Sequence, residues 1–501
     1  MTAVRARSGV LPLEALVFAV GVSSLGAEIA ATRLLAPFFG TSTVIWANTI
    51  AVVLLALSAG YKLGGVLADR RPQLAALQTL VLVGAVLLAV VPFIAHPFLT
   101  LSVEAFDTLS VGAFAASLFG TLILVAVPLL LLGAVSPWAT RLKLAAVEEA
   151  GATAGRLYAI STVGSLVGVF FVSLWAIEAI GTQRTFLVLA LVPALTAARG
   201  VGFVVPAALA AALALPVGTT KSAESGRVIF ETETPYQYAR VVEFEDGSRR
   251  LELNEGQAIH SLLKPGTVLT GGYWDGFLVL PFATGSGLPP RSIAALGTAG
   301  GTVPRAYLHY FPQTRIDAVD IDPELFKIGH RYFGLPRSQQ LHEVAQDARP
   351  FLRATRQRYD SIFVDAYRQP YIPFYLTTRE FFSLVRDRLR PGGTVIINVG
   401  HPEESQELEK ALSATLGKVF AHVARDPIQN LNSLVIASDS QLSAEAVRKA
   451  PLPREVSALA AQSAGRIEPA LRGGTVFTDD RAPVEWLIDA SIVTYAAEGG
   501  G

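Results

Sequence analysis

The sequence predicts a bundle of membrane-spanning α-helices followed by a doubly wound α/β domain with a small β region at its N-terminal end. Long apolar runs with few charges fill residues 11–217, and each approaches the roughly 20 residues needed to cross a bilayer. From Lys221 onward charges recur every few residues, and beyond residue 286 strand-like and helix-like segments alternate. Such alternation indicates a mostly parallel sheet covered by helices. We therefore expect domains at 1–218, 219–285 and 286–501.

The composition is consistent with two unlike halves. The 501 residues carry 41 Lys and Arg against 41 Asp and Glu, and only 16% are charged, where a soluble domain has about 25%. Zero net charge argues against nucleic acid as a partner, because phosphate binding needs a basic surface. The absence of cysteine excludes disulfides, thiolate metal sites and cysteine nucleophiles.

The N-terminal half divides into six or seven candidate spans. The apolar runs lie at 11–31, 44–68, 74–95, 113–137, 157–180, 183–198 and 201–217, and the last two are short. Glycines recur four residues apart in the pairs Gly60 and Gly64, Gly151 and Gly155, and Gly164 and Gly168. This spacing lets helix backbones approach closely in lipid, and we interpret it as ordinary intramembrane packing.

Positive charge predicts the orientation of the spans. Lys and Arg fall on alternate connections, at Arg5, Arg7, Arg70, Arg71, Arg141, Lys143, Arg156 and Arg199. The positive-inside rule then places the N-terminus in the cytoplasm. Six crossings leave the following domain in the cytoplasm and seven put it outside, and the sequence leaves both open.

The α/β half contains a series of short strand candidates. Strands are expected at 227–230, 239–244 and 250–253, with a hairpin signal at Asp246-Gly247. Further strands are expected at 292–296, 315–319, 343–345, 361–364, 394–399 and 433–438. Ligands bind a doubly wound sheet at the carboxyl ends of its strands.

Glycines and acids follow those strands. Gly297, Gly300 and Gly301 form a turn after the first strand of the alternating region, where a ligand meets backbone N–H groups. Asp320 and Asp322 end the second strand, near the spacing at which an acid takes ribose hydroxyls. Asp347 and Asp365 end the third and fourth. Each acid alone is also a good helix N-cap, but the full set favours a nucleoside site.

These motifs resemble the spermidine synthase (aminopropyltransferase) family, and more narrowly its bacterial members fused to a membrane bundle. The resemblance covers about residues 226–400. It rests on Thr234–Gln237, Leu253–Gln257, Tyr273–Asp275, Gly297–Arg305, Val319–Asp322, Asp347–Ala348, Tyr359–Asp365 and the tail Thr478–Glu485. It implies a Rossmann-like domain of the S-adenosylmethionine-dependent transferase type.

The resemblance also implies roles. Asp365 is the catalytic base, with Tyr236 and Tyr273 orienting the amine. The nucleoside site comprises Gln237, His260, Gly297, Gly300, Gly301, Asp320, Asp322, Asp347 and Ala348. The co-substrate is decarboxylated S-adenosylmethionine, or S-adenosylmethionine itself, and we expect no permanently bound cofactor and no metal. For each tyrosine, and for the lone His260, ordinary packing is the alternative.

The amine side departs from the family pattern. Ala299 stands where the family has an acid, and Leu269 and Thr270 replace an Asp-Glu pair. The segment after Asp365 lacks the second acid that holds a cationic amine, and it brings Arg368 instead. The expected replacements for amine binding are Asp275, Tyr367, Asp479, Asp480 and Glu485.

We therefore expect a membrane-bound aminopropyltransferase that releases methylthioadenosine. A methyltransferase or other alkyl transferase on the same fold is the alternative, since fold does not fix function. A third possibility is a transporter or sensor that binds a nucleoside or polyamine. The expected partners are a small amine, the lipid bilayer and a second copy in a homodimer. We expect a bacterial inner-membrane protein whose catalytic domain faces the cytoplasm, where the nucleoside donor is made.

Overall fold

The computed structural model describes residues 13–39, 43–108, 112–144, 146–215, 223, 225–254, 258–367, 372–400 and 405–487. The chain forms two compact units. The first comprises residues 1–222 together with Glu233–Gln237, and the second comprises Ala223–Thr232 and the chain from Tyr238 onward. Arg5 and Arg7, which enter the orientation argument, lie outside the described residues.

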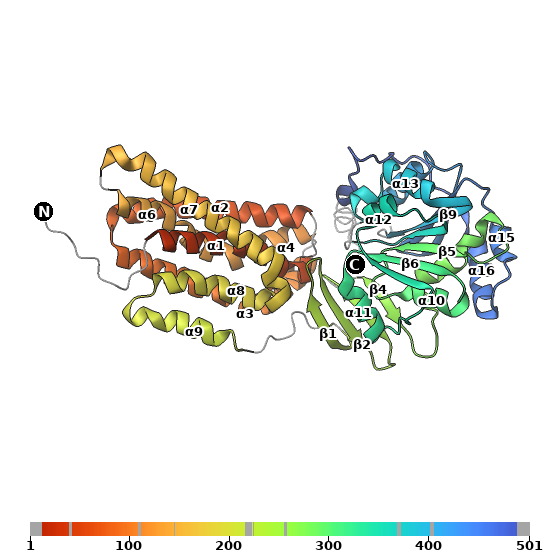
Figure 1. Ribbon diagram of the computed structural model, residues 1–501, viewed down its shortest axis with the longest axis horizontal. Helices are drawn as coiled ribbons and strands as arrows, with labels where there is room; N and C mark the ends of the chain where they lie inside the picture. Colours follow the sequence, from red (N-terminus) through yellow and green to blue (C-terminus); the bar gives the residue numbers. More distant parts are fainter. Residues whose placement is uncertain are drawn as a thin grey trace. The chain divides into compact units, whose positions relative to one another are not determined.

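The first unit is helical (Figure 1). Its α-helices are α1 (Leu13–Phe39), α2 (Thr43–Arg70), α3 (Leu74–Thr108), α4 (Gly112–Thr121), α5 (Val127–Gly133), α6 (Val135–Lys143), α7 (Ala150–Phe171), α8 (Ile177–Ala197) and α9 (Val204–Ala212). Among the described residues, five helical stretches are long and apolar enough to cross a membrane: Leu13–Phe38, Ile45–Arg70, Leu74–Ala95, Ser117–Lys143 and Ala150–Ala197.

The fifth stretch contains two of the predicted spans. Gly181 interrupts it with φ +78° and ψ 166°, which are not helical values. The chain on both sides of this break packs on α1, since Gly164 lies against Phe18 and Gly26 lies against Leu189. In the region of the predicted span 201–217, the described residues form a short apolar helix at Gly200–Ala212, which is shorter than a full crossing requires.

Two of the three glycine pairs mediate close helix packing. A Cβ atom added to Gly60 or Gly64 would overlap the backbone at Leu130 or Ala134, and Gly164 and Gly168 meet the backbone of α1 in the same way. Gly151 and Gly155 have open space at this position, so the structure assigns them no such contact.

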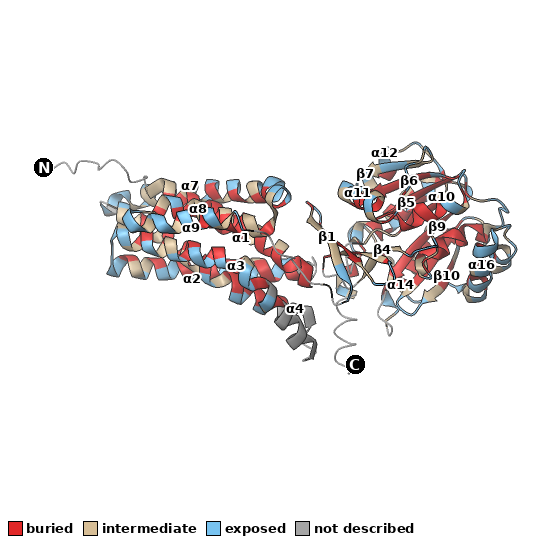
Figure 2. Cartoon of the chain, turned by 90° about the horizontal axis from the view of Figure 1, so that it is seen from below, coloured by how far each residue is buried: buried red, intermediate tan, exposed pale blue. Residues whose placement is uncertain are grey.

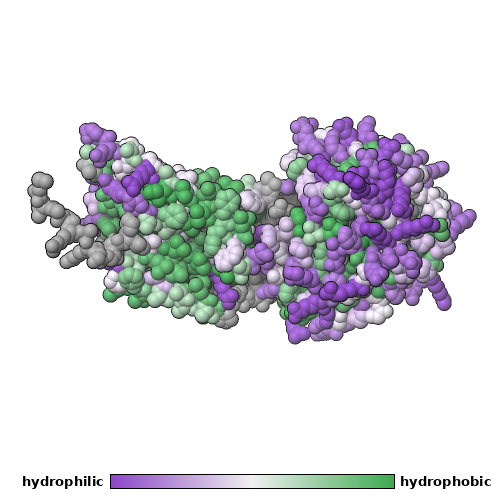
Figure 3. Space-filling model, viewed as in Figure 1, coloured by the Kyte–Doolittle hydropathy of each residue, from purple (hydrophilic) through white to green (hydrophobic). Residues whose placement is uncertain are grey.

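The outward surface of the helical unit is apolar. Buried residues face the inside of the bundle (Figure 2), whereas Leu55, Leu174 and Val204 are each 70% exposed. On the face shown in Figure 3, apolar residues cover most of the helical unit and hydrophilic residues cover most of the other unit. An apolar surface of this extent suits contact with lipid.

The second unit begins with a four-stranded sheet. Its order is β1 (Arg227–Glu233), β2 (Tyr238–Glu243), β3 (Arg249–Leu253) and β4 (Ile259–Leu263). The predicted hairpin lies between β2 and β3, where Gly247 has φ +76°. Strand β4 was not predicted, and residues 273–284 form two 3-10 helices, η5 (Tyr273–Leu278) and η6 (Leu280–Thr284).

An eight-stranded sheet follows, and it confirms the doubly wound α/β prediction. Its strands are β5 (Ser292–Leu296), β6 (Arg315–Asp320), β7 (Leu341–Ala345), β8 (Tyr359–Val364), β9 (Leu389–Gly400), β10 (His422–Gln429), β11 (Asn432–Ser438) and β12 (Glu468–Pro469). They lie in the order β12-β10-β11-β9-β8-β5-β6-β7. The pairs among β5 to β9 are parallel and those beyond β9 antiparallel. Because β5 has β6 on one side and β8 on the other, the order reverses there.

Helices cover both faces of this sheet (Figure 1). They are α10 (Thr302–Tyr310), α11 (Pro323–Tyr332), α12 (Ala348–Ala354), α13 (Arg379–Arg388), α14 (Glu407–Leu416), α15 (Ala444–Arg448) and α16 (Arg454–Arg466). Ala294 and Leu296 of β5 pack in one core with Phe381 and Leu412, while Ile293 and Ala295 pack in another with Tyr307. With both faces buried, only the strand ends are open to a ligand.

Candidate functional site

The glycine turn brings the ends of β5 and β8 together. Gly297 has φ +85°, and a Cβ atom there would lie 2.5 Å from both the Ala366 Cα and the Asp365 carbonyl oxygen. The Asp365 N–H donates to the Leu296 carbonyl at 2.8 Å. Only glycine fits this backbone conformation and this approach. Gly297 therefore positions Asp365 at the point where the strand order reverses.

Asp320 holds the same turn from the neighbouring strand. Its Oδ2 accepts hydrogen bonds from the N–H groups of Thr298 at 3.0 Å and Ala299 at 2.9 Å. Its Oδ1 accepts from the Asp322 N–H at 3.1 Å. Burial raises the pKa of Asp320 to about 6, against the effect of these three bonds. Oδ1, which accepts a single hydrogen bond, retains a lone pair for a ligand hydroxyl, so the ribose role stays a prediction that this geometry allows.

Asp322 and Asp347 both act as helix N-caps. Asp322 is fully buried and accepts from the Glu324 N–H at 3.1 Å. Asp347 accepts from the Arg349 N–H at 2.9 Å, and its second oxygen accepts from the Tyr375 hydroxyl at 2.6 Å. The N-cap alternative is therefore realised for these two acids. Asp347 and the buried Ala348 still lie at the carboxyl end of β7, where the neighbouring Gln346 N–H donates to the Asp320 carbonyl.

Asp365 and Tyr273 are brought together from separate parts of the chain. The Tyr273 hydroxyl donates to Asp365 Oδ2 at 3.1 Å, and the side-chain amide of Asn398 donates to Oδ1 at 2.9 Å. Burial raises the pKa of Asp365 to about 7, and both hydrogen bonds oppose that rise. Burial also raises the pKa of Tyr273 well above its ordinary value, so its hydroxyl stays protonated and donates. The carboxyl group can thus exchange a proton near neutral pH.

Asn398 is a site residue that the sequence did not single out. Its side-chain oxygen accepts from the Asn432 amide at 2.9 Å, and its backbone carbonyl accepts from the Tyr367 hydroxyl at 3.0 Å. Tyr367 in turn accepts from the Gly400 N–H at 2.6 Å. Tyr367 therefore fixes the end of β9. The sequence did contain a sign of this role, since Asn398 is a polar residue inside the apolar run Val395–Val399. Polar side chains are seldom buried unless they have a partner or a function.

His260 lies beside the glycine turn. The adjacent Ser261 hydroxyl accepts from the Gly300 N–H at 2.8 Å, which attaches β4 to the turn. The His260 Nε2 atom is buried and has no hydrogen-bond partner among the residues that the structure describes. Burial lowers the pKa of His260 to about 4, so the ring is neutral at pH 7. A buried polar atom without a partner is costly, and a ligand hydroxyl or ring nitrogen would satisfy it.

The proposed replacement acids have other contacts. Asp275 accepts four hydrogen bonds from Thr270 and Gly271, at 2.7 to 3.1 Å. Asp479 accepts from Arg349 and Thr378. Both carboxylates therefore hold the fold, and these contacts do not favour a role in amine binding. Asp480 is exposed and Glu485 half-buried, and their roles stay predictions.

Tyr236 and Gln237 lie in the turn between β1 and β2. The Thr234 hydroxyl accepts from both of their N–H groups at 3.1 Å. This turn belongs to the first unit, so the predicted roles of both residues stay predictions. Glu255, Gly256, Gln257 and Arg368, which enter the motif comparison, lie outside the described residues.

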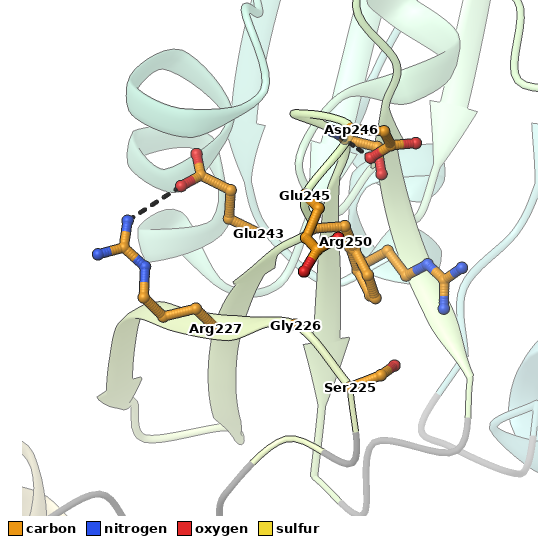
Figure 4. A pocket seen from close by; sticks show the side chains of 9 residues that line it. Ser225, Gly226, Arg227, Glu243, Glu245, Asp246 and Arg250 are labelled. Carbon is orange, nitrogen blue, oxygen red and sulfur yellow. Dashed lines mark hydrogen bonds and ion pairs between the residues drawn. The ribbon is translucent and has the colours of Figure 1, made fainter.

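A second concave surface lies on the small sheet. It is an open groove of about 830 Å³, lined by Ser225, Gly226, Arg227, Glu243, Phe244, Glu245, Asp246, Ser248 and Arg250 (Figure 4). Arg227 pairs with Glu243 at 3.1 Å, and the Arg250 guanidinium lies 4.4 Å from the centre of the Phe244 ring. None of the predicted site residues line it. Within the described ranges, no three His, Asp or Glu side chains are grouped to hold a metal ion.

Comparisons with known proteins agree with the resemblance seen in the sequence. The family model for the spermine/spermidine synthase domain matches residues 280–431. A probable polyamine aminopropyl transferase of Bifidobacterium longum is 32% identical over 194 residues, which are 38% of this chain and 42% of that protein. A polyamine aminopropyltransferase of Vibrio vulnificus is 34% identical over 134 residues, which are 26% of this chain and 44% of that protein. The chain thus spans less than half the length of these relatives.

Solved structures include similar chains. The crystal structure of a probable spermidine synthase from Corynebacterium glutamicum superposes with a TM-score of 0.39 at 22% identity, covering 49% of this chain and 96% of that one. A spermidine synthase from Thermotoga maritima gives a TM-score of 0.38 at 17% identity, covering 48% of this chain and 88% of that one.

Proposed function

Because the chain carries a spermine/spermidine synthase domain over residues 280–431, we propose that it is a membrane-bound aminopropyltransferase. It transfers the aminopropyl group of decarboxylated S-adenosylmethionine to an amine and releases methylthioadenosine. One observation carries the proposal. A carboxylate with its pKa raised to about 7 stands where the strand order reverses, held by Tyr273 and Asn398.

The donor binds across the ends of β5, β6 and β7. Asp320 accepts the ribose hydroxyls while it holds the glycine turn. Asp347 and Ala348 contact the adenine, and the Nε2 atom of His260 forms a hydrogen bond with a polar atom of the nucleoside. Support comes from the carboxyl-end position of these residues and from the unpartnered His260 nitrogen. This places the sulfonium toward Asp365.

The reaction is a substitution at carbon. The lone pair of a neutral amine attacks the carbon next to the sulfonium, a C–N bond forms, and the C–S bond breaks with its electrons going to sulfur. The amine is protonated at pH 7, so the Asp365 carboxylate must accept its proton. Tyr273 keeps the carboxylate oriented, and holding both reactants in place contributes about 7–11 kcal/mol to lowering the barrier.

The acceptor is an amine held by aromatic rings and Asp365. Tyr273 and Trp274 pack with ring centres 4.4 Å apart beside the carboxylate. Aromatic faces attract a cation, which supports an ammonium group at this place. Since Asp275 and Asp479 are engaged elsewhere in the fold, the charge of the acceptor is matched mainly by Asp365.

The helical unit anchors the enzyme in the bacterial inner membrane, with the catalytic unit in the cytoplasm. Its five long apolar stretches, one of them broken at Gly181, support six crossings. Gly200–Ala212 spans 13 residues, or about 20 Å of helix, less than the roughly 30 Å of hydrocarbon. The orientation can be tested with a reporter enzyme that is active only in the periplasm, fused after residue 487. Activity of this fusion would contradict the cytoplasmic orientation.

The test is to identify the product. Full-length protein in detergent is incubated with labelled decarboxylated S-adenosylmethionine or S-adenosylmethionine and a set of amines. Methylthioadenosine together with an aminopropylated amine is the expected result. Formation of S-adenosylhomocysteine identifies a methyltransferase instead. Ligand binding without either product identifies a transporter or sensor.

A further inference from the structure

The tail segment Phe477–Glu485 has no role in the reaction described above, yet it is firmly attached to the catalytic unit. Phe477 is fully buried and Val484 is 1% exposed, both in the core with Phe381 and Phe382. The Phe477 N–H donates to the Thr415 hydroxyl at 2.9 Å, and its carbonyl accepts from the Arg379 N–H at 2.9 Å. The tail is therefore a fixed part of the fold.

A tight turn projects Asp479 from this segment. Thr478 and Arg481 exchange two backbone hydrogen bonds of 3.0 Å. Asp479 accepts from both Nη atoms of Arg349, at 2.8 and 2.6 Å, and from the Thr378 hydroxyl at 2.7 Å. The Arg349 side chain is only 11% exposed. A two-pronged pair of this kind fixes orientation as well as distance.

Arg349 connects this pair to the proposed adenine contact. Its backbone N–H donates to Asp347 Oδ1 at 2.9 Å, and its Nη1 atom donates to the Tyr375 carbonyl at 3.1 Å. The Tyr375 hydroxyl donates to Asp347 at 2.6 Å. The tail and the Tyr375 turn thus meet at the Arg349 guanidinium group, and Asp347 meets the backbone of the same residue.

We propose that Asp479 is a positioning residue for the donor, which acts through Arg349 and Tyr375 to hold Asp347 in place. The inference rests on the proposed function and gives the ion pair of Asp479 and Arg349 a role other than binding the amine. Without the pair, Arg349 loses its carboxylate partner and Tyr375 loses an anchor, so Asp347 samples more orientations. Donor binding weakens, while Asp365, Tyr273 and Asn398 keep their contacts.

The test measures methylthioadenosine binding by calorimetry, and the KM values for donor and amine, on full-length protein. We expect Asp479→Asn to weaken methylthioadenosine binding and raise the donor KM by roughly three- to tenfold, with the amine KM unchanged. The control is Asp439→Asn, which removes the Arg386 pair at 2.7 Å, where the acid has a similar exposure. This control should change none of these values.

Arg349→Lys provides a second variant, which keeps the charge and loses the two-pronged geometry. It should weaken methylthioadenosine binding as Asp479→Asn does, and the double variant should be no weaker than the single ones. Wild-type affinity in a folded Asp479→Asn or Arg349→Lys protein would overturn the inference, as would equal rises in both KM values. Failure of the wild-type protein to bind any nucleoside would instead remove the proposed function and this inference with it.

Discussion

The side-chain amide of Asn398 donates a 2.9 Å hydrogen bond to the carboxylate of Asp365. The two residues stand at the ends of the neighbouring parallel strands β9 and β8. Since Asn398 is itself held by Asn432 at 2.9 Å, the orientation of the proposed base is set by two side chains in series.

The first prediction concerns pH. With the pKa of Asp365 raised to about 7 by burial, kcat/KM should rise with pH and level off above about 7, because only the carboxylate accepts the proton. Asp365→Asn should reduce kcat by about 100- to 10,000-fold and abolish this rise of kcat/KM with pH, the acidic limb of the profile. Its affinity for methylthioadenosine should be retained. A wild-type pH profile in that variant would remove Asp365 as the base.

The second prediction concerns Asn398. Its hydrogen bond lowers the pKa of Asp365, so Asn398→Ala should move the pH limb to higher values and reduce kcat roughly tenfold. Tyr273→Phe removes the other donor and should move the limb in the same direction. If Asn398→Ala lowers kcat without moving the limb, Asn398 does not act through the protonation of Asp365.

The third prediction concerns Gly297. Gly297→Ala places a methyl group 2.5 Å from the Asp365 backbone and should displace that residue, lowering kcat by about 100-fold. Gly334→Ala is the matched control, since Gly334 also has positive φ, +65°, but nothing within 4 Å of the added atom. Both variants should lose about 1 kcal/mol of stability from the backbone conformation. Equal kcat in the two would show that the contact with Asp365 is unimportant.

The fourth prediction separates the two tasks of Asp320. Asp320→Ala loses both the hydrogen bonds to Thr298 and Ala299 and the ribose contact, so methylthioadenosine binding should weaken roughly tenfold or more. Asp320→Asn keeps an acceptor oxygen for the turn and should weaken binding less. Calorimetry would show this ranking, and unchanged affinity in both variants would refute the ribose role.

The fifth prediction is a cost in stability. The folded pKa of Asp365, about 7, lies above its ordinary value of 3.8, so the folded state binds its proton more tightly. The stabilisation from that proton is complete below about pH 4 and is lost as pH rises to 7. At pH 8 the free energy of unfolding of Asp365→Asn should therefore exceed that of wild type by on the order of a few kcal/mol, so the variant should unfold at a higher temperature. Greater stability of wild type at pH 8 would contradict this.

The sequence predicted the parallel strands well because their apolar runs end in glycine or acid residues. It missed β10, which contains Arg425 and Asp426 within the strand. Two adjacent charged residues are typical of a loop rather than of a buried strand. In the structure, however, Arg425 pairs with Glu409 at 2.5 Å and Asp426 pairs with Arg466 at 2.7 Å. The partners come from α14 and α16, so only the tertiary structure explains a strand there.

The site was predicted in part. Asp320, Asp365 and the glycine turn were singled out by motifs at strand ends and Tyr273 by the family resemblance, and the structure places Tyr273 against Asp365 and Asp320 against the turn. Asn398 and the contacts of Asp479 do not, because both depend on side chains that meet across distant parts of the chain. The spacing of residues along the sequence does not show which acid forms an ion pair with an arginine in the fold.

The charged pairs of β10 also bear on the order of folding. Burying Arg425 or Asp426 without its partner costs several kcal/mol, so β10 cannot dock stably before α14 and α16 are in place. The buried acid of β6, Asp317, accepts from the Tyr359 hydroxyl of β8 at 2.6 Å, so its partner lies within strands β5 to β9. Nascent chain that has emerged only as far as β11 should therefore contain the paired strands β5 to β9, while β10 still lacks the ion pair with Arg466.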